Sequence, residues 1–215
     1  ILTSFNPVRI AASCNGWAFI HAAVLLLACS LASPWQFNFP MTEAAPLEPT
    51  FQQAMEITAQ WLALWENGEL SDEVIGDRIS ELVASRDGAR GFFVVSLAGD
   101  CPLMDRLPDP VVFALRQAGD GVVDLSARNL AMSTAMALHH ERNADAAQQA
   151  GSERVQSRCT ELLRVLEPEA VKGRLETLLE ATEGRGEDVA FLKRWGYDAG
   201  QTAAIAEAVL AVAEG

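Results

Sequence analysis

Residues 122–143 read VVDLSARNLAMSTAMALHHERN and carry the longest helical pattern of the chain. Apolar side chains recur along it every three or four positions, which is the spacing of one face of an α-helix. The stripe consists of Leu125, Met132, Ala135 and Met136, backed by Leu130 and Leu138. We therefore predict one long helix over residues 122–143, with the rest of the fold arranged around it.

Similar apolar stripes lie on both sides of this segment, each with its own start signal. Thr50 and Gln53 have the spacing of a capping box, and Pro110 follows Asp109 as a first helical residue after a cap. Ser152 and Asp198 are further candidate N-caps. Short connections between seven or eight amphipathic helices predict an all-α fold with a single globular domain.

One segment departs from this helical pattern. Residues 92–97, FFVVSL, have the aromatic and β-branched content of a short buried strand, and Gly88 and Gly91 before them suggest a break. No second strand follows with which it could pair. A strand-like segment at 92–97 and a buried helical turn therefore both remain open.

The composition changes near Met41. Residues 1–40 contain a single charged side chain, Arg9, whereas residues 41–215 hold 15 Lys and Arg against 29 Asp and Glu, a net charge of −14. We expect 41–215 to be an acidic helical domain and 1–40 to lie outside its core. An acidic surface repels phosphate backbones, so we expect no nucleic acid partner.

The apolar stretch of residues 17–35 has several possible origins. It could be a signal peptide or a lipoprotein leader acylated at Cys29, or a membrane anchor of barely sufficient length. It could also be an upstream translated segment ahead of a true start at Met41. We expect no membrane contact unless residues 17–35 are a native anchor, and otherwise a cytoplasmic protein with reduced cysteines.

No motif in the chain specifies a reaction. The glycine-rich dinucleotide fingerprint and the phosphate loop are both absent, and Ser96 does not lie in a nucleophile elbow. We therefore predict no cofactor and name no catalytic residue.

Polar residues along the long helix form the first candidate binding surface. They are Arg128, His139 and Arg142 on one face, and Asn129, Ser133 and His140 on the adjacent face. Amphipathic helices normally have a solvated side, and that is the simpler interpretation, with a lined pocket as the alternative. Consecutive helical residues point about 100° apart, so the two histidines do not share one metal ion, and we predict no metal site.

Trp61 and Trp65 lie one helical turn apart and form the second candidate surface. Aromatic side chains at this spacing usually belong to the core because they bury a large area. The alternative is a surface that contacts a partner or a pigment.

Four runs of the sequence resemble a conserved hypothetical family of cyanobacteria. They are residues 129–136, followed by His140, Arg142 and Asn143, and residues 91–95, 152–155 and 191–198. The likeness covers residues 50–213 and none of 1–40. It implies a soluble cyanobacterial protein that starts at Met41, and it assigns no catalytic residue.

These observations favour a non-enzymatic helical module that binds a protein partner or a second copy of itself, in an assembling or regulatory role. The rival hypothesis is a ligand-binding domain or enzyme along residues 122–143. In it, His139 or His140 acts as a general base or axial ligand, since histidine titrates near neutrality.

Overall fold

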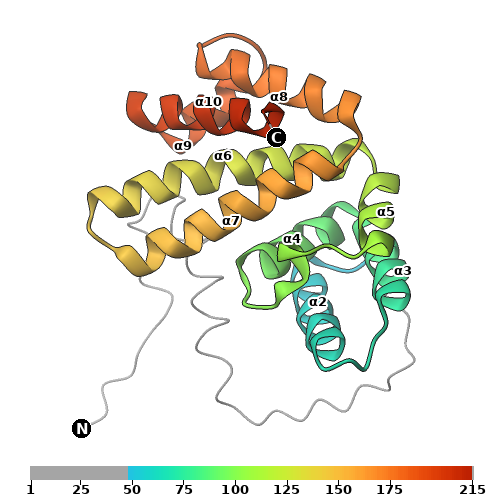
Figure 1. Cartoon of the computed structure of the whole chain (residues 1–215). Coiled ribbons are helices and arrows are strands. Elements are labelled where there is room, and N and C mark those ends of the chain that lie inside the picture. Colours follow the sequence, from blue (N-terminus) through green and yellow to red (C-terminus); the bar gives the residue numbers. More distant parts are fainter. Residues whose placement is uncertain (1–47, 215) are drawn as a thin grey trace, which may run out of the picture. The chain divides into compact units, whose positions relative to one another are not determined.

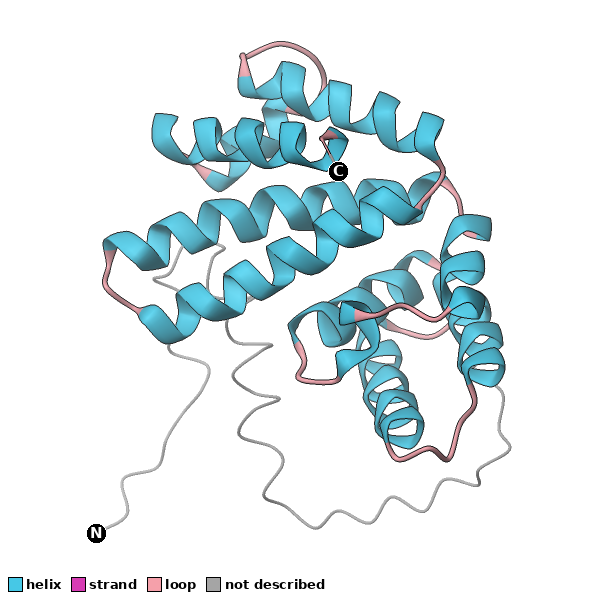
Figure 2. Ribbon diagram, viewed as in Figure 1, coloured by secondary structure: helices cyan, strands magenta, loops and turns pink. Residues whose placement is uncertain are grey.

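The computed structural model of the chain describes residues 48–214, and these residues fold almost entirely into helices (Figure 1). The α-helices are α2 Phe51–Glu66, α3 Asp72–Val83, α4 Arg86–Ala98, α5 Asp109–Gln117, α6 Asp120–Arg142, α7 Ala146–Val165, α8 Pro168–Thr182, α9 Val189–Trp195 and α10 Ala199–Ala213. A 3-10 helix, η2, covers Pro102–Asp105. Within residues 48–214 there is no strand, so the predicted all-α class is confirmed (Figure 2).

The predictions for residues 1–40 fall outside the described part of the chain. Among the helices within residues 48–214, none combines the length and the apolar character that a membrane span requires.

The helix starts follow the expected local chemistry in α2 and α10. Thr50 accepts a hydrogen bond from the Gln53 backbone while the Gln53 side chain accepts one from the Thr50 backbone. Asp198 and Gln201 repeat this capping box at the start of α10. Each box satisfies backbone donors that the first helical turn leaves open.

The strand-like interpretation of residues 92–97 is wrong, since this segment lies inside α4. The glycines before it do not break the helix either. A Cβ atom on Gly91 would lie 2.5 Å from Ala54 Cβ, so the missing side chain lets α4 cross α2 at close range. The helix is buried over much of its circumference, which explains why its sequence lacks a polar face.

Three other boundaries differ from the expectation. Asp109 is the first residue of α5 and not its N-cap, a position that Pro108 takes. Ser152 is not an N-cap, because α7 begins six residues earlier, at Ala146, and is capped by Asp145. Residues 146–150, AAQQA, are good helix formers, so the helix includes them and Gly151 does not mark its start. The long helix, predicted over 122–143, covers Asp120–Arg142.

Helices α6 and α7 form a long helical hairpin at the centre of the described residues (Figure 1). Helices α8 and α10 pack against this hairpin, and α9 follows α8. Helices α2, α3, α4 and α5 pack among themselves and meet the hairpin chiefly through α4 and α7. One continuous core of buried apolar side chains runs through all of these contacts.

A buried arginine joins α7 to the segment that follows α4. Arg158, 3% exposed, makes two hydrogen bonds of 2.7 Å to the Asp105 carboxylate. It also donates to the carbonyl oxygens of Ser96, Leu97 and Gly99, which lie at the end of α4. Hydrogen bonding to Arg158 lowers the pKa of the Asp105 carboxyl group.

Candidate functional site

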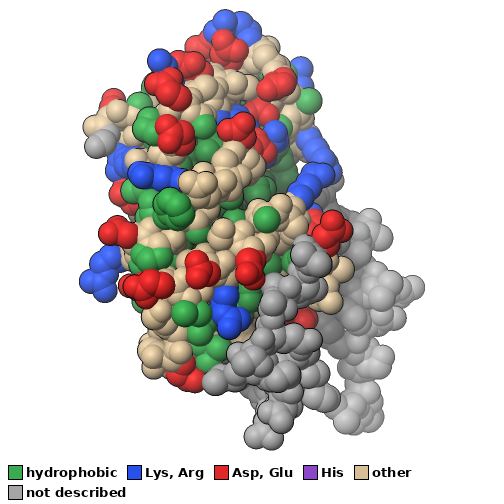
Figure 3. All heavy atoms as spheres, turned by 90° about the vertical axis from the view of Figure 1, so that its right-hand side faces the viewer, with side chains coloured by type: hydrophobic (Ala, Val, Ile, Leu, Met, Phe, Trp, Pro, Cys, Tyr) green, Lys and Arg blue, Asp and Glu red, His purple; other side chains and the backbone are tan. Residues whose placement is uncertain are grey.

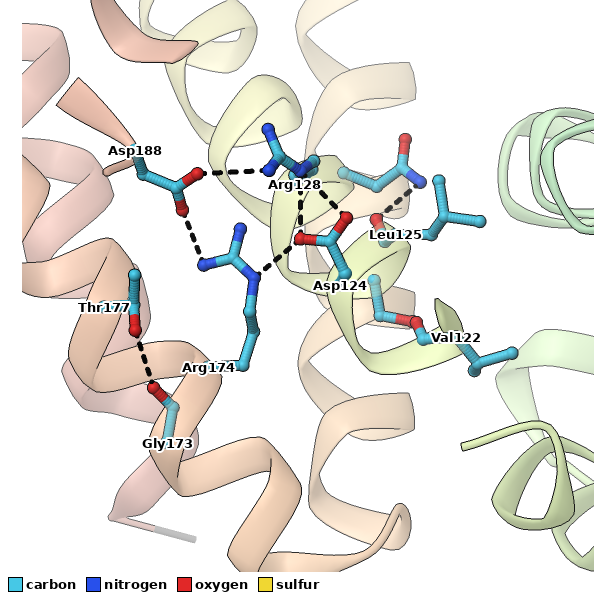
Figure 4. A network of polar contacts seen from close by, with 10 residues as sticks. Val122, Asp124, Leu125, Arg128, Gly173, Arg174, Thr177 and Asp188 are labelled. Carbon is cyan, nitrogen blue, oxygen red and sulfur yellow. Dashed lines mark hydrogen bonds and ion pairs between the residues drawn. The ribbon is translucent and has the colours of Figure 1, made fainter. Parts of the chain in front are cut away.

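Arg128, a predicted site residue, belongs to a network of two arginines and two aspartates that joins α6 to α8 and α9 (Figure 4). Its Nε lies 3.0 Å from Asp124, and its Nη2 lies 3.1 Å from Asp188. Arg174 of α8 reaches Asp124 at 2.7 Å and Asp188 at 2.6 Å. The guanidinium of Arg128 also lies 4.8 Å from the ring centre of Phe191, in cation–π geometry.

The network pairs two positive with two negative charges. The side chains of Arg128, Arg174 and Asp188 are buried or only partly exposed. Asp188 is buried just before α9, where an unpaired carboxylate would be costly. This arrangement fixes the start of α9 against α6 and α8, although Nη2 of Arg174 is buried and makes no hydrogen bond.

Asn129 and Ser133 both direct hydrogen bonds to their own helix. Asn129 donates to the Leu125 carbonyl at 2.9 Å, and the Ser133 hydroxyl donates to the Leu130 carbonyl at 3.1 Å. Neither hydrogen bond points to a binding site, so the predicted binding role of Asn129 and Ser133 stays a prediction.

The histidines lie at the end of α6 with their rings in edge-to-face contact, 5.5 Å between centres. His139 is exposed and lies 3.1 Å from the Asn143 side chain, whereas His140 is buried. Arg142 is held by Asp198 across to α10. A ligand-binding or catalytic role for either histidine stays a prediction, and no group of three or more metal-ligating side chains occurs within residues 48–214.

The two tryptophans of the second candidate surface lie on α2, far from the α6 residues in sequence. Trp61 is 6% exposed and packs in the core, under the guanidinium of Arg78 at 5.3 Å. Trp65 is partly exposed and donates its indole N–H to Asp72 at 2.8 Å. Little of the Trp61 ring is accessible, so only Trp65 presents surface to a partner in this structure.

An open groove lies between α6, α7 and α10, with a volume of about 360 Å³. We name it the α6–α7–α10 groove. Helix α6 contributes Thr134, Ala137, Leu138 and Glu141 to it. Their spacing of i, i+3, i+4 and i+7 places them on one face of the helix.

The other two helices line the groove with the same periodicity. Helix α7 contributes Gln149, Glu153 and Gln156, and α10 contributes Ala204, Glu207, Ala208 and Ala211. The most buried of the lining residues are Thr134, Ala137 and Ala208, which form its bottom. Small side chains at the bottom and longer polar ones around them give the groove its depth.

Thr134 has a buried hydroxyl that makes no hydrogen bond. The side chain is 5% exposed. A helical threonine commonly donates to the carbonyl four residues earlier, as Thr58 does to Ala54 at 2.7 Å. For Thr134 that carbonyl is Leu130 O, which already accepts the Ser133 hydroxyl. Of the threonines inside the described helices, Thr134 is the one whose hydroxyl has no partner.

The charge at the groove has one sign. Each of the three helices supplies one glutamate, Glu141, Glu153 and Glu207, and none of the lining residues is Lys or Arg. The face drawn in Figure 3 differs, because acidic and basic side chains are intermixed across it. The groove is therefore a locally acidic surface with small side chains at its bottom.

The sequence did not reveal this groove, although part of its signal is visible there. In α10, Ala204, Ala208 and Ala211 lie at helical spacing with Glu207. Such a stripe is also typical of an ordinary buried face, and only the angles between α6, α7 and α10 show that it borders an open groove.

Comparison with known proteins identifies a family and gives no activity. No curated protein and no solved structure matches the chain. The model of the family described as "Uncharacterised conserved protein UCP020893" matches residues 50–212, which is well over half of the 215 residues. The match confirms the predicted membership of a conserved family over nearly the predicted range, while the cyanobacterial origin stays a prediction. The chain belongs to the family of uncharacterised conserved protein UCP020893.

Proposed function

We propose that this protein is a non-enzymatic helical module that binds a segment of another protein in the α6–α7–α10 groove. The observation that carries the proposal is the convergence of three helices on one open groove. Two of them contribute residues at i, i+3, i+4 and i+7, and α7 contributes a stripe of the same length. A groove bordered by helices over about two turns is the kind of surface in which an amphipathic helical segment docks.

The bottom of the groove supports close packing of a partner. Alanine at 137, 204 and 208 lets another helix approach, because the distance between packed helix axes falls as the intervening side chains become smaller. Each wall extends over about two helical turns, or roughly 10 Å. This length suits a short docking segment better than a large obligate interface.

Site-specific photocrosslinking in the cells that produce the protein tests the proposal. A photoreactive amino acid replaces Ala204, which lines the groove, and in a separate control replaces Ala203, which is exposed and does not line it. We expect a defined crosslinked protein from position 204 and not from position 203. The purified partner should then bind the natural chain and lose at least tenfold in affinity for Ala204→Gln but not for Ala203→Gln.

Equal crosslinking from both positions would contradict the proposal, as would equal affinity of the two glutamine variants. A second copy of the chain is one form of the partner, and light scattering with the same two variants tests it. A dimer that Ala204→Gln dissociates and Ala203→Gln preserves would identify that form.

A cytoplasmic location remains part of the proposal. It is supported by Cys101 and Cys159, which are both free thiols. Burial raises the pKa of the Cys159 thiol, as expected for an inert core cysteine rather than a reactive one. Fractionation of the producing cells, with antibody detection, tests the location.

A further inference from the structure

The charge of the α6–α7–α10 groove identifies the chemistry of its occupant. We propose that the partner segment is a basic amphipathic helix, with a stripe of small apolar residues against the alanines and Lys or Arg side chains against the three glutamates. This inference rests on the proposed function, because it assumes that a helical segment occupies the groove.

The chain itself does not neutralise these glutamates. The nearby arginines on α6 and α7 are paired elsewhere, Arg142 with Asp198 and Arg154 with Asp100. Arg164 reaches Glu161 and the Ala211 carbonyl. Glu153 accepts a hydrogen bond from Gln149, which carries no charge. Three carboxylates around one groove therefore present a negative potential that favours a cationic partner.

The shape of the groove favours a helix over a small polycation. Ala204, Ala208 and Ala211 follow one face of α10 over two turns, and a polyamine that paired with the glutamates would leave the accessible Ala204 and Ala211 facing water. An amphipathic helix covers the alanines and places charged side chains on both sides of its apolar stripe, where the glutamates lie.

Thr134 is the one lining residue with a buried hydroxyl that makes no hydrogen bond. Thr134 lines the groove, its hydroxyl is buried, and the carbonyl that this hydroxyl would normally use already accepts the Ser133 hydroxyl. A buried hydroxyl without a partner is costly, and buried polar groups are nearly always satisfied in folded proteins. A bound segment would reach this buried hydroxyl only after the Thr134 side chain rotates toward the groove.

Fluorescence anisotropy with the full chain and four probes tests the inference. The first probe is an 18-residue helical peptide with an alanine and leucine stripe flanked by lysines. The second replaces the lysines by glutamates. The third keeps the composition of the first but destroys the stripe, and spermidine, added as a competitor, is the fourth. We expect only the first to bind, more tightly at low salt than at high salt.

Two charge-matched triple variants locate the binding. Glu141→Gln, Glu153→Gln and Glu207→Gln together remove the groove charges, and we expect them to weaken binding of the first peptide at least tenfold. Glu69→Gln, Glu169→Gln and Glu176→Gln remove the same net charge from exposed sites outside the groove. We expect this control set to change the affinity less than twofold.

Each other outcome overturns the inference in a recognisable way. Equal losses in both triple variants would mean unspecific attraction to an acidic chain. If the lysine and glutamate peptides bind equally, the groove binds helices but does not select a cationic partner. If the stripe-less peptide and spermidine bind as tightly as the first peptide, the groove is a small-polycation site. No binding of any probe rejects the basic helix, while the crosslinking at position 204 still decides the proposed function.

Discussion

Arg158 of α7 and Asp105 of η2 face each other through two hydrogen bonds of 2.7 Å, with the arginine almost fully buried. The same guanidinium caps the carbonyl end of α4, so α7 meets two consecutive segments, α4 and η2, that lie more than 50 residues earlier in the sequence. The Asp105 carboxylate is half exposed, so water can solvate it when Arg158 is replaced. The loss of Arg158 therefore acts mainly on the α4 carbonyl oxygens, which lose their donor.

Arg158→Lys should therefore destabilise the protein strongly. An ammonium has three donors on one atom and cannot reproduce the planar, forked contacts of the guanidinium. We expect the free energy of unfolding to fall by about 2–3 kcal/mol in urea denaturation, since several charge-assisted hydrogen bonds are lost. Arg154→Lys is the matched control, because its pair with Asp100 is exposed and should contribute less than about 0.5 kcal/mol.

The same pair predicts a pH dependence. Since the pKa of Asp105 is lower in the folded protein than its usual 3.8, the folded state binds this proton less readily than the unfolded state. The stabilisation is fully present above pH 3.8 and is lost as the pH falls through the lower folded value. We expect the stability difference between the natural chain and Asp105→Asn to shrink below about pH 4. A difference that stays constant from pH 6 to pH 3 would contradict this.

Gly91 and Gly173 form a matched pair of helical glycines with opposite predicted effects. Gly91→Ala places a methyl group 2.5 Å from Ala54 Cβ and should destabilise the protein by about 1–3 kcal/mol through overpacking of α2 against α4. Gly173 in α8 has open space around it, so Gly173→Ala should stabilise by roughly 0.5–1 kcal/mol through helix propensity. Thermal unfolding of the two variants side by side checks both signs.

Thr134→Val tests whether the threonine hydroxyl is truly without a partner in the isolated chain. Valine has nearly the same shape, so removing an unsatisfied hydroxyl should leave stability unchanged or raise it by about 1 kcal/mol. The control is Thr58→Val, where the buried hydroxyl donates to Ala54 and its loss should cost about 1 kcal/mol. Equal destabilisation by the two substitutions would show that Thr134 is satisfied without an occupant.

The sequence was sufficient for the fold class and for the helix starts that have a complete local signal. Thr50 with Gln53 and Asp198 with Gln201 form capping boxes and start helices there, whereas Asp109 and Ser152 lack that second residue and are not N-caps. Residues 92–97 were ambiguous for a physical reason. A helix buried on most sides loses the polar face that distinguishes it, and Gly91 serves a crossing with α2 that only the folded chain reveals.

The candidate site depended on tertiary geometry to a greater degree. The polar stripe of α6 was visible in the sequence, yet its members point to different neighbours: Arg128 to α8 and α9, Ser133 to its own backbone, and Arg142 to α10. Thr134 gave no signal of its own, because its missing hydrogen bond follows from the Ser133 rotamer. The acidic groove arises from three helices that are separate in sequence, so periodicity alone could not bring its glutamates together.

The most direct measurement is the backbone amide NMR spectrum of the full chain during titration with the lysine-flanked peptide. If the groove is the binding surface, the largest shift changes will fall within residues 134–141, 149–156 and 204–211, and Ala204→Gln will abolish them while Ala203→Gln does not. Changes centred elsewhere, for instance around the exposed Phe113 of α5, or a spectrum that does not change at saturating peptide, would contradict the account.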